Sequence, residues 1–186
     1  MRLLWWNVQH LEQKCFDEAF WEILEDVDIA FLVETHHEVV PNRAGWQCYG
    51  KPAVAEGNGR SGGVVVLIRN HIEVQPDEVQ QPFDGFIWVR LTRPNGNPLW
   101  CGGVYIPGAS DRRFRSLQGH GKTDHFKALR EQLEHRAGTA WLLGGDLNAA
   151  TGSSQPLYGS PDILDHAVLL QTNAQHRGMG NDSWKL

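Results

Sequence analysis

The sequence predicts an α/β fold in which two mixed sheets pack face to face with helices outside, a four-layer α/β/β/α sandwich. Three observations favour this architecture. The apolar run at residues 64–68 is too continuous for a strand with one wet face, so it needs cover on both sides. A strand–helix–strand order near the start favours a parallel pair, whereas an Asn-Gly turn signal further on favours an antiparallel pair. The pattern is therefore neither a purely doubly wound sheet nor an all-β sandwich.

The first third of the chain is expected to form a strand, a helix and a second strand. Residues 3–8 and 28–34 are apolar runs of strand length, and the segment between them is amphipathic. The apolar positions of this helix recur at helical spacing and are Phe16, Phe20, Ile23 and Leu24. A flexible glycine-rich turn at residues 56–63 then leads into the buried strand at residues 64–68.

The second half is expected to contain a hairpin, a longer helix and further short elements. Residues 86–91 and 99–106 flank a segment with Asn-Gly and prolines, which predicts an antiparallel pair. A helix is predicted between residues 111 and 137, and Gly138 is well placed to end it. The apolar face of this helix consists of Phe126, Leu129 and Leu133. One short helical candidate covers residues 163–170.

Composition narrows the classes of function. The chain has 186 residues, 41% of them hydrophobic, which suits a single domain, residues 1–186, with one sizeable core. A formal charge of −5 argues against binding nucleic acid through a generally basic surface, so any polyanion contact must be local. The cysteines have no Cys-x-x-Cys spacing, and reduced thiols are expected. The opening apolar run ends at Asn7, too short for a signal peptide or membrane span, so an intracellular location, the nucleus included, is expected.

Five polar residues stand where an apolar strand pattern stops. They are Asn7, Glu34, Tyr105, Asp146 and Asn148, the last two following a strand predicted at residues 140–143. Functional groups converge at strand ends in layered α/β proteins. Each residue also has a plain structural interpretation, as a turn former, a helix cap or an aromatic at the rim of a sheet. For each residue taken alone, both interpretations stay open.

Five short motifs occur in one order between residues 5 and 148. They are Trp6-Asn7-Val8, Leu32-Val33-Glu34-Thr35, Gly62-Gly63-Val64-Val65-Val66, Val104-Tyr105-Ile106-Pro107 and Gly145-Asp146-Leu147-Asn148. In this order and spacing they resemble the endonuclease/exonuclease/phosphatase superfamily. It includes exonuclease III-like abasic-site endonucleases, deoxyribonuclease I, inositol polyphosphate phosphatases, sphingomyelinases and the endonucleases of non-LTR retrotransposons.

The resemblance implies a phosphodiesterase that depends on Mg²⁺, with Mn²⁺ as a substitute. Glu34, assisted by the amide of Asn7, would hold the ion, which suits the few carboxylates that Mg²⁺ usually takes. Asp146 would orient or deprotonate the attacking water. Asn148 would hold that aspartate or donate to the phosphate, and Tyr105 would face the phosphate with its hydroxyl. DNA cleavage would leave a 5′-phosphate and a 3′-hydroxyl.

Two departures from the superfamily pattern bear on activity. Gln9 stands where many DNA-repair relatives carry an aspartate that helps to hold the metal. Relatives also carry a late Ser-Asp-His motif whose histidine binds the scissile phosphate. Asp165-His166 is the nearest candidate, but it comes too early and is interpreted as part of a surface helix. We therefore expect the domain to lack its last strands and its Asp-His motif, and to have weak or no nuclease activity alone.

The substrate prediction rests on resemblance. The short loops and the polar tract after Asn148 look most like the endonuclease domain of a non-LTR retrotransposon, so DNA is the expected partner. Arg112, Arg113 and Arg115 form a basic strip beside the proposed site, with a solvated helix entry as the alternative. A phosphomonoesterase or sphingomyelinase-like enzyme of the same fold remains an alternative, as does a catalytically dead binding or remnant module.

Overall fold

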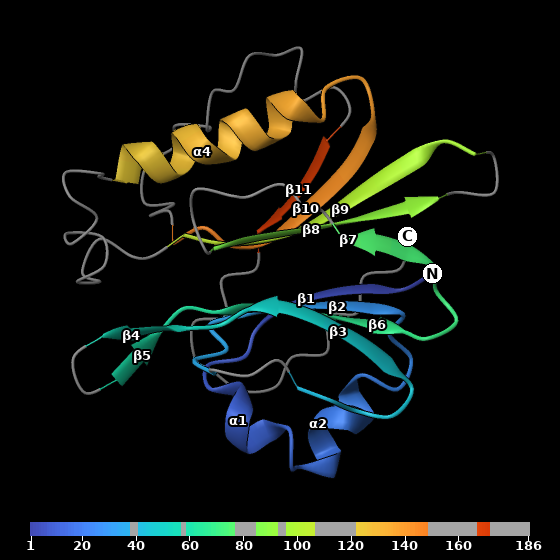
Figure 1. Cartoon of the computed structure of the whole chain (residues 1–186), viewed down its shortest axis with the longest axis vertical. Coiled ribbons are helices and arrows are strands. Elements are labelled where there is room, and N and C mark those ends of the chain that lie inside the picture. Colours follow the sequence, from blue (N-terminus) through green and yellow to red (C-terminus); the bar gives the residue numbers. More distant parts are fainter. Residues whose placement is uncertain are drawn as a thin grey trace.

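The computed structural model describes residues 1–37, 41–56, 59–76, 85–92, 96–106, 122–148 and 167–171. Two sheets pack face to face (Figure 1). The helices α1 (Leu11–Lys14) and α2 (Glu18–Ile23) lie outside the first sheet, and α4 (Lys122–His135) lies outside the second. The predicted α/β architecture of two mixed sheets with helices outside is confirmed. No helix in these ranges is long and apolar enough to cross a membrane.

The first sheet has the strand order β1-β2-β6-β3. Its strands are β1 (Leu3–Asn7), β2 (Ile29–Val33), β6 (Val64–Arg69) and β3 (Trp46–Lys51). β1 and β2 run parallel, whereas β6 is antiparallel to both β2 and β3. The strand–helix–strand unit with a parallel pair is thus present as predicted. Every residue of β2 is buried, because one face of the strand packs under the helices and the other faces the second sheet.

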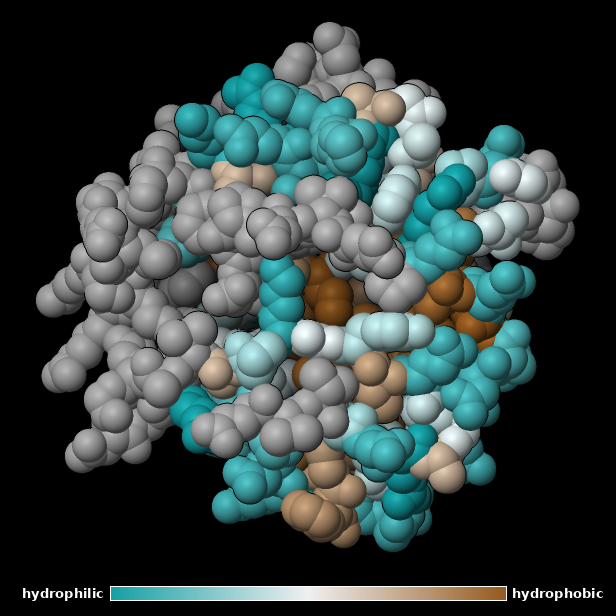
Figure 2. Space-filling model, viewed as in Figure 1, coloured by the Kyte–Doolittle hydropathy of each residue, from teal (hydrophilic) through white to brown (hydrophobic). Residues whose placement is uncertain are grey.

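Two short helices replace the single amphipathic helix that the sequence predicts before β2. Asp17 causes the break, since its side chain caps α2 by accepting a hydrogen bond of 3.0 Å from a backbone N–H of the first turn. The predicted apolar face is right for Phe20 and Leu24, which are buried. It is wrong for Phe16 and Ile23, which are 87% and 58% exposed. Apolar side chains accordingly appear on the surface at the α1 and α2 end of the molecule (Figure 2).

The second sheet has the strand order β11-β10-β9-β8-β7. Its strands are β7 (Val74–Pro76), β8 (Phe86–Thr92), β9 (Pro98–Tyr105), β10 (Ala140–Asp146) and β11 (Ala167–Gln171). β8 and β9 form the predicted antiparallel hairpin, and β10 runs parallel to β9. The predicted helix is α4, which buries Leu129 against this sheet. Gly138 follows it with a φ of +82°, a conformation that suits glycine at a helix end.

Two segments differ from their predicted structure. Residues 167–171 form β11, parallel to β10, where the sequence predicts part of a short helix over 163–170. A short apolar run fits either structure, and pairing with the edge of β10 decides for the strand. The predicted flexible turn at residues 56–63 contains strand residues instead, since β4 (Val54–Glu56) and β5 (Gly59–Ser61) pair antiparallel.

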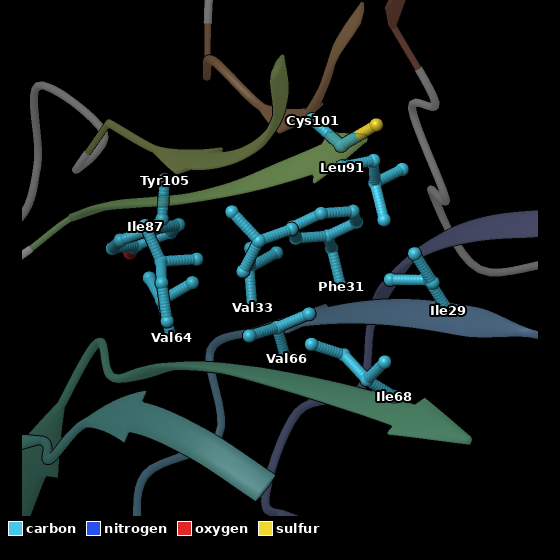
Figure 3. Packing of buried hydrophobic residues seen from close by; sticks show 11 residues of the cluster. Ile29, Phe31, Val33, Val64, Val66, Ile68, Ile87, Leu91, Cys101 and Tyr105 are labelled. Carbon is cyan, nitrogen blue, oxygen red and sulfur yellow. The ribbon is translucent and has the colours of Figure 1, made fainter. Parts of the chain in front are cut away.

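The space between the two sheets is filled by apolar side chains (Figure 3). Those from the first sheet include Phe31, Val33, Val64, Val66 and Ile68, and those from the second include Ile87, Val89, Leu91, Cys101 and Tyr105. This layer explains why β2 and β6 read as continuous apolar runs in the sequence.

Trp5 links the two sheets. Its indole Nε1 donates a hydrogen bond of 2.8 Å to the carbonyl oxygen of Gly102 in β9. A Cβ added to Gly144 would lie 2.5 Å from the indole ring, so bare backbone at this position lets β1 approach β10 closely. Asn7 and Asp146 lie two residues further along these strands, on the same faces as Trp5 and Gly144. The packing of Trp5 therefore sets the approach of the sheets beside the polar strand ends.

Candidate active site

Asn7 and Glu34 are brought together by the parallel pairing of β1 and β2. Asn7 ends β1 opposite Val33, and Glu34 follows Val33 directly. The carboxyl ends of parallel strands meet at the same edge of a sheet, so both polar residues belong to one edge. Backbone pairing continues beyond the ends of the two strands. The N–H of Val8 donates to the backbone carbonyl of Val33 at 3.0 Å, and the N–H of His10 donates to the backbone carbonyl of Glu34 at 3.1 Å.

The Glu34 segment is held in an uncommon backbone conformation. Glu34 and His36 have φ angles of +53° and +51°, a region that residues with side chains rarely occupy. The backbone N–H groups of Thr35 and His36 donate to the carbonyls of Gly63 and Gly62, at 3.3 and 2.9 Å. Gly63 itself has a φ of +84°, and a Cβ there would collide with the hydroxyl oxygen of Thr35. The backbone of Gly62 and Gly63 therefore holds the segment that follows Glu34 in place.

Asp146 ends β10 and accepts a hydrogen bond on each carboxylate oxygen. Its Oδ2 accepts from Asn7 Nδ2 at 2.9 Å, and its Oδ1 accepts from the backbone N–H of Asn148 at 2.9 Å. The first of these bonds crosses from the first sheet to the second. Asn148 adopts a φ of +43°, and its Nδ2 donates to the carbonyl oxygen of Ile106 at 3.0 Å. Groups from both sheets therefore fix the orientation of the Asp146 carboxylate.

Tyr105 lies opposite Asp146 in the parallel register of β9 and β10. Its side chain is 4% exposed and packs in the layer between the sheets, beside Ile87 and facing Val64 (Figure 3). Its backbone N–H donates to the carbonyl oxygen of Gly85 at 2.7 Å. The structure thus places Tyr105 at the same strand ends as Asp146, and the contact of its hydroxyl with a phosphate stays a prediction.

Oxygen donors for a hard cation are available beside Glu34. The half-buried Glu34 carboxylate makes no hydrogen bond or ion pair in the part of the chain that the structure describes. The Oδ1 of Asn7 accepts one hydrogen bond, from the Gln9 backbone N–H at 3.2 Å, and keeps a second lone pair. The described residues contain no cluster of three or more His, Cys, Asp or Glu that would hold a metal. One carboxylate and one amide oxygen fit a hydrated Mg²⁺ or Mn²⁺ ion.

The thiols do not contribute reactive groups near neutral pH. Burial raises the pKa of Cys15 to about 11 and that of Cys101 to about 12. Burial also raises the pKa of Cys48. A thiol must lose its proton to act as a nucleophile or metal ligand. All three thiols are therefore protonated near neutral pH.

Some predicted site residues lie outside the described ranges. They are Arg112, Arg113, Arg115, Asp165 and His166. Conversely, the structure brings together His10 and His36, with ring nitrogens 3.2 Å apart, which the sequence does not pair. The signal for this contact is absent from the sequence because it depends on two loops that follow different strands.

These features define a class of protein: an α/β/β/α sandwich whose polar site lies where the carboxyl ends of β1, β2, β9 and β10 meet. Glu34 follows a strand of the first sheet, and Asn7 of the same sheet donates a hydrogen bond to Asp146 of the second sheet. The chain belongs to the endonuclease/exonuclease/phosphatase family, whose model matches residues 4–184. A comparison with curated proteins finds no match.

Three solved structures illustrate the similarity of fold. The catalytic domain of APE2 from Xenopus laevis has a TM-score of 0.60 and 16% identity, covering 80% of this chain and 59% of that chain. The endonuclease domain of TRAS1, a telomere-specific non-LTR retrotransposon, has a TM-score of 0.53 and 17% identity, covering 80% and 59%. The 3′ phosphatase NExo from Neisseria, bound to a product DNA hairpin, has a TM-score of 0.52 and 20% identity, and the match covers 81% of this chain and 58% of that chain. This chain therefore spans less than two thirds of the length of these structures, and the likeness shows the fold.

Proposed function

We propose that this chain is a single phosphodiesterase domain that depends on Mg²⁺ and nicks DNA, as a retrotransposon endonuclease does. The observation that carries the proposal is the hydrogen bond of 2.9 Å between Asn7 Nδ2 and Asp146 Oδ2, which joins the two sheets next to Glu34. Membership of a family of nucleases and phosphatases supports the reaction type. Similarity of fold to the TRAS1 endonuclease domain and to NExo, which was solved with a product DNA hairpin, supports DNA as the substrate.

Glu34 and Asn7 Oδ1 are assigned to hold the metal. A bound Mg²⁺ ion would supply neutralisation of charge on a phosphodiester oxygen and on the departing alkoxide. Both of Asn7's polar atoms then have defined roles, since Nδ2 already donates to Asp146. This arrangement would couple the placement of the metal to the placement of the aspartate, because one amide group bonds to both.

Asp146 is assigned to orient and deprotonate the attacking water. Its Oδ1 and Oδ2 each accept one protein hydrogen bond, so the carboxylate cannot rotate freely and its remaining lone pairs have fixed directions. The water oxygen would form a bond to phosphorus as the bond to the 3′-oxygen breaks, with the water proton passing to Asp146. Tyr105 would donate a hydrogen bond to the phosphate as negative charge builds up. Arg112, Arg113 and Arg115 would contact flanking phosphates.

The test compares nicking of supercoiled DNA in Mg²⁺ with binding of Mn²⁺ followed by electron paramagnetic resonance. Glu34→Gln should abolish both, because it removes the negatively charged ligand. Asp146→Asn should lower nicking by about 10²–10⁴-fold, the usual contribution of a general base, and leave Mn²⁺ binding in place. Glu22→Gln is the matched control, since Glu22 is an exposed carboxylate on α2, away from the strand ends. It should change neither readout.

Other outcomes favour the alternatives. Nicking that survives both Glu34→Gln and Asp146→Asn contradicts the assigned roles. Faster hydrolysis of a 3′-phosphate on DNA, or of a soluble phosphate monoester, than of supercoiled plasmid favours a phosphomonoesterase; the 3′ phosphatase NExo has a similar fold. Mn²⁺ binding without any hydrolysis favours a binding module.

A further inference from the structure

His10 and His36 form a contact at the loops that follow β1 and β2. The Nδ1 of His36 lies 3.2 Å from Nδ1 and 3.4 Å from Nε2 of His10. The two rings meet edge to face, with centroids 4.4 Å apart and an interplanar angle of 80°. His10 is exposed and His36 is half-buried. A pair of imidazoles with nitrogens this close is therefore accessible from solvent.

The backbone holds both residues in place. The N–H of His10 donates to the carbonyl of Glu34 at 3.1 Å, and the N–H of His36 donates to that of Gly62 at 2.9 Å. Both histidines have a positive φ, +69° and +51°, which costs free energy in a residue with a side chain. His10 also stands at the N-cap of α1, but its side chain makes no capping hydrogen bond. Local helix formation therefore does not account for histidine at this position.

The spacing of the nitrogens suits two ligands of one metal ion. Zn²⁺ binds imidazole nitrogen at about 2.0–2.1 Å with tetrahedral geometry, which separates two ligand nitrogens by roughly 3.3 Å. Whichever His10 nitrogen serves as the ligand, its separation from His36 Nδ1, 3.2 Å for Nδ1 or 3.4 Å for Nε2, is close to that value. The His10 ring is exposed and its χ2 torsion is soft, so small rotations can turn a nitrogen lone pair toward a shared ion.

We propose that His10 and His36 form a binding site for a late first-row divalent ion such as Zn²⁺, Ni²⁺ or Cu²⁺, with water in the other coordination positions. Imidazole nitrogen favours these ions, whereas Mg²⁺ favours oxygen. The site is therefore chemically distinct from the oxygen site at Glu34 and Asn7. It does not rest on the proposed phosphodiesterase activity, because binding is measured without turnover.

The experiment is a calorimetric titration of the full chain with Zn²⁺ in the presence of saturating Mg²⁺. The variants His10→Asn and His36→Asn remove one imidazole each, and asparagine tolerates a positive φ better than most residues, so the backbone is not further strained. Circular dichroism checks that each variant is folded. His71→Asn is the matched control, because His71 is an exposed histidine near Asp28, at the other end of β2.

Each imidazole should be needed for the same bound ion. His10→Asn and His36→Asn should each weaken one Zn²⁺ site by more than about tenfold, since even loss of a supporting group costs a metal site this much. The double variant should bind one ion fewer per chain than the wild type, and His71→Asn should bind as the wild type does. Glu34→Gln should leave this site intact. An unchanged number and affinity of bound Zn²⁺ ions in the folded double variant would overturn the proposal.

Discussion

Gly144→Ala tests whether the fit of Trp5 against bare backbone sets the distance between the sheets. The added Cβ would lie 2.5 Å from Cγ and Cδ2 of the indole and 2.7 Å from Cδ1. The ring is not free to retreat, because its Nε1 is bonded to Gly102 and its face stacks on Phe31, with centroids 5.5 Å apart. Either the indole or β10 must therefore move.

The magnitude follows from two contributions. Overpacking of a filled core typically costs about 1–3 kcal/mol. Displacement of the indole also breaks its hydrogen bond to the Gly102 carbonyl, which contributes about 0.5–1.5 kcal/mol. We expect Gly144→Ala to lower the free energy of unfolding by roughly 2–4 kcal/mol. The bond of 2.9 Å between Asn7 and Asp146 should lengthen as well, because both residues lie two positions beyond the collision.

The assay is equilibrium unfolding in urea, arranged as a double-mutant cycle with Trp5→Leu. A leucine at position 5 has no anchor on Gly102 and can turn away from the new methyl group. Gly144→Ala should therefore cost at least about 1 kcal/mol less in the Trp5→Leu background than in the wild type. If the two free-energy changes add within about 0.5 kcal/mol, residues 5 and 144 do not constrain each other and the reasoning is refuted.

Two further predictions concern the glycine motif and the thiols. Gly63→Ala should lower the free energy of unfolding by about 1–3 kcal/mol more than Gly45→Ala does, and it should weaken Mn²⁺ binding. Both glycines have a positive φ, but a Cβ at Gly63 would meet Thr35, whereas a Cβ at Gly45 would meet nothing within 4 Å. Equal losses of stability in urea unfolding would contradict this role of Gly63. Because burial raises the folded pKa of Cys101 from 9.0 to about 12, its contribution to stability should be present below pH 9 and lost between pH 9 and 12. Unfolding curves across that range should show a shallower fall for Cys101→Ala, and an unchanged slope would argue against the assigned burial effect.

The elements that local patterns predict well are those whose pattern agrees with their environment. β2 and β6 are covered on both faces, and they read as unbroken apolar runs. The hairpin of β8 and β9 has its turn residues, and α4 has both an apolar face and a glycine at its end. The sequence does not predict β3 and β7, because β7 is short and β3 mixes polar and apolar residues. Pairing with neighbouring strands holds these segments extended.

The helix before β2 and the segment 163–170 show why local patterns fail elsewhere. Apolar spacing alone suggests a continuous helix through Phe16, but the cap at Asp17 starts a new helix and leaves Phe16 in solvent. The apolar run that forms β11 is too short for its periodicity to distinguish a helix from a strand, and pairing with β10 makes it a strand. In both cases a competing contact outweighs a weak local preference.

From the sequence alone, the strand-length apolar runs and the polar residues that end them already indicate the fold class and name Asn7, Glu34, Tyr105, Asp146 and Asn148 as candidates. What only the tertiary structure decides is which of these groups touch. Asn7 and Asp146 are 139 positions apart, and their hydrogen bond joins two separate sheets beside the close packing of Trp5 on Gly144. Periodicity within a strand carries no information about the distance between sheets, because that distance is set by side chains from several elements packing together.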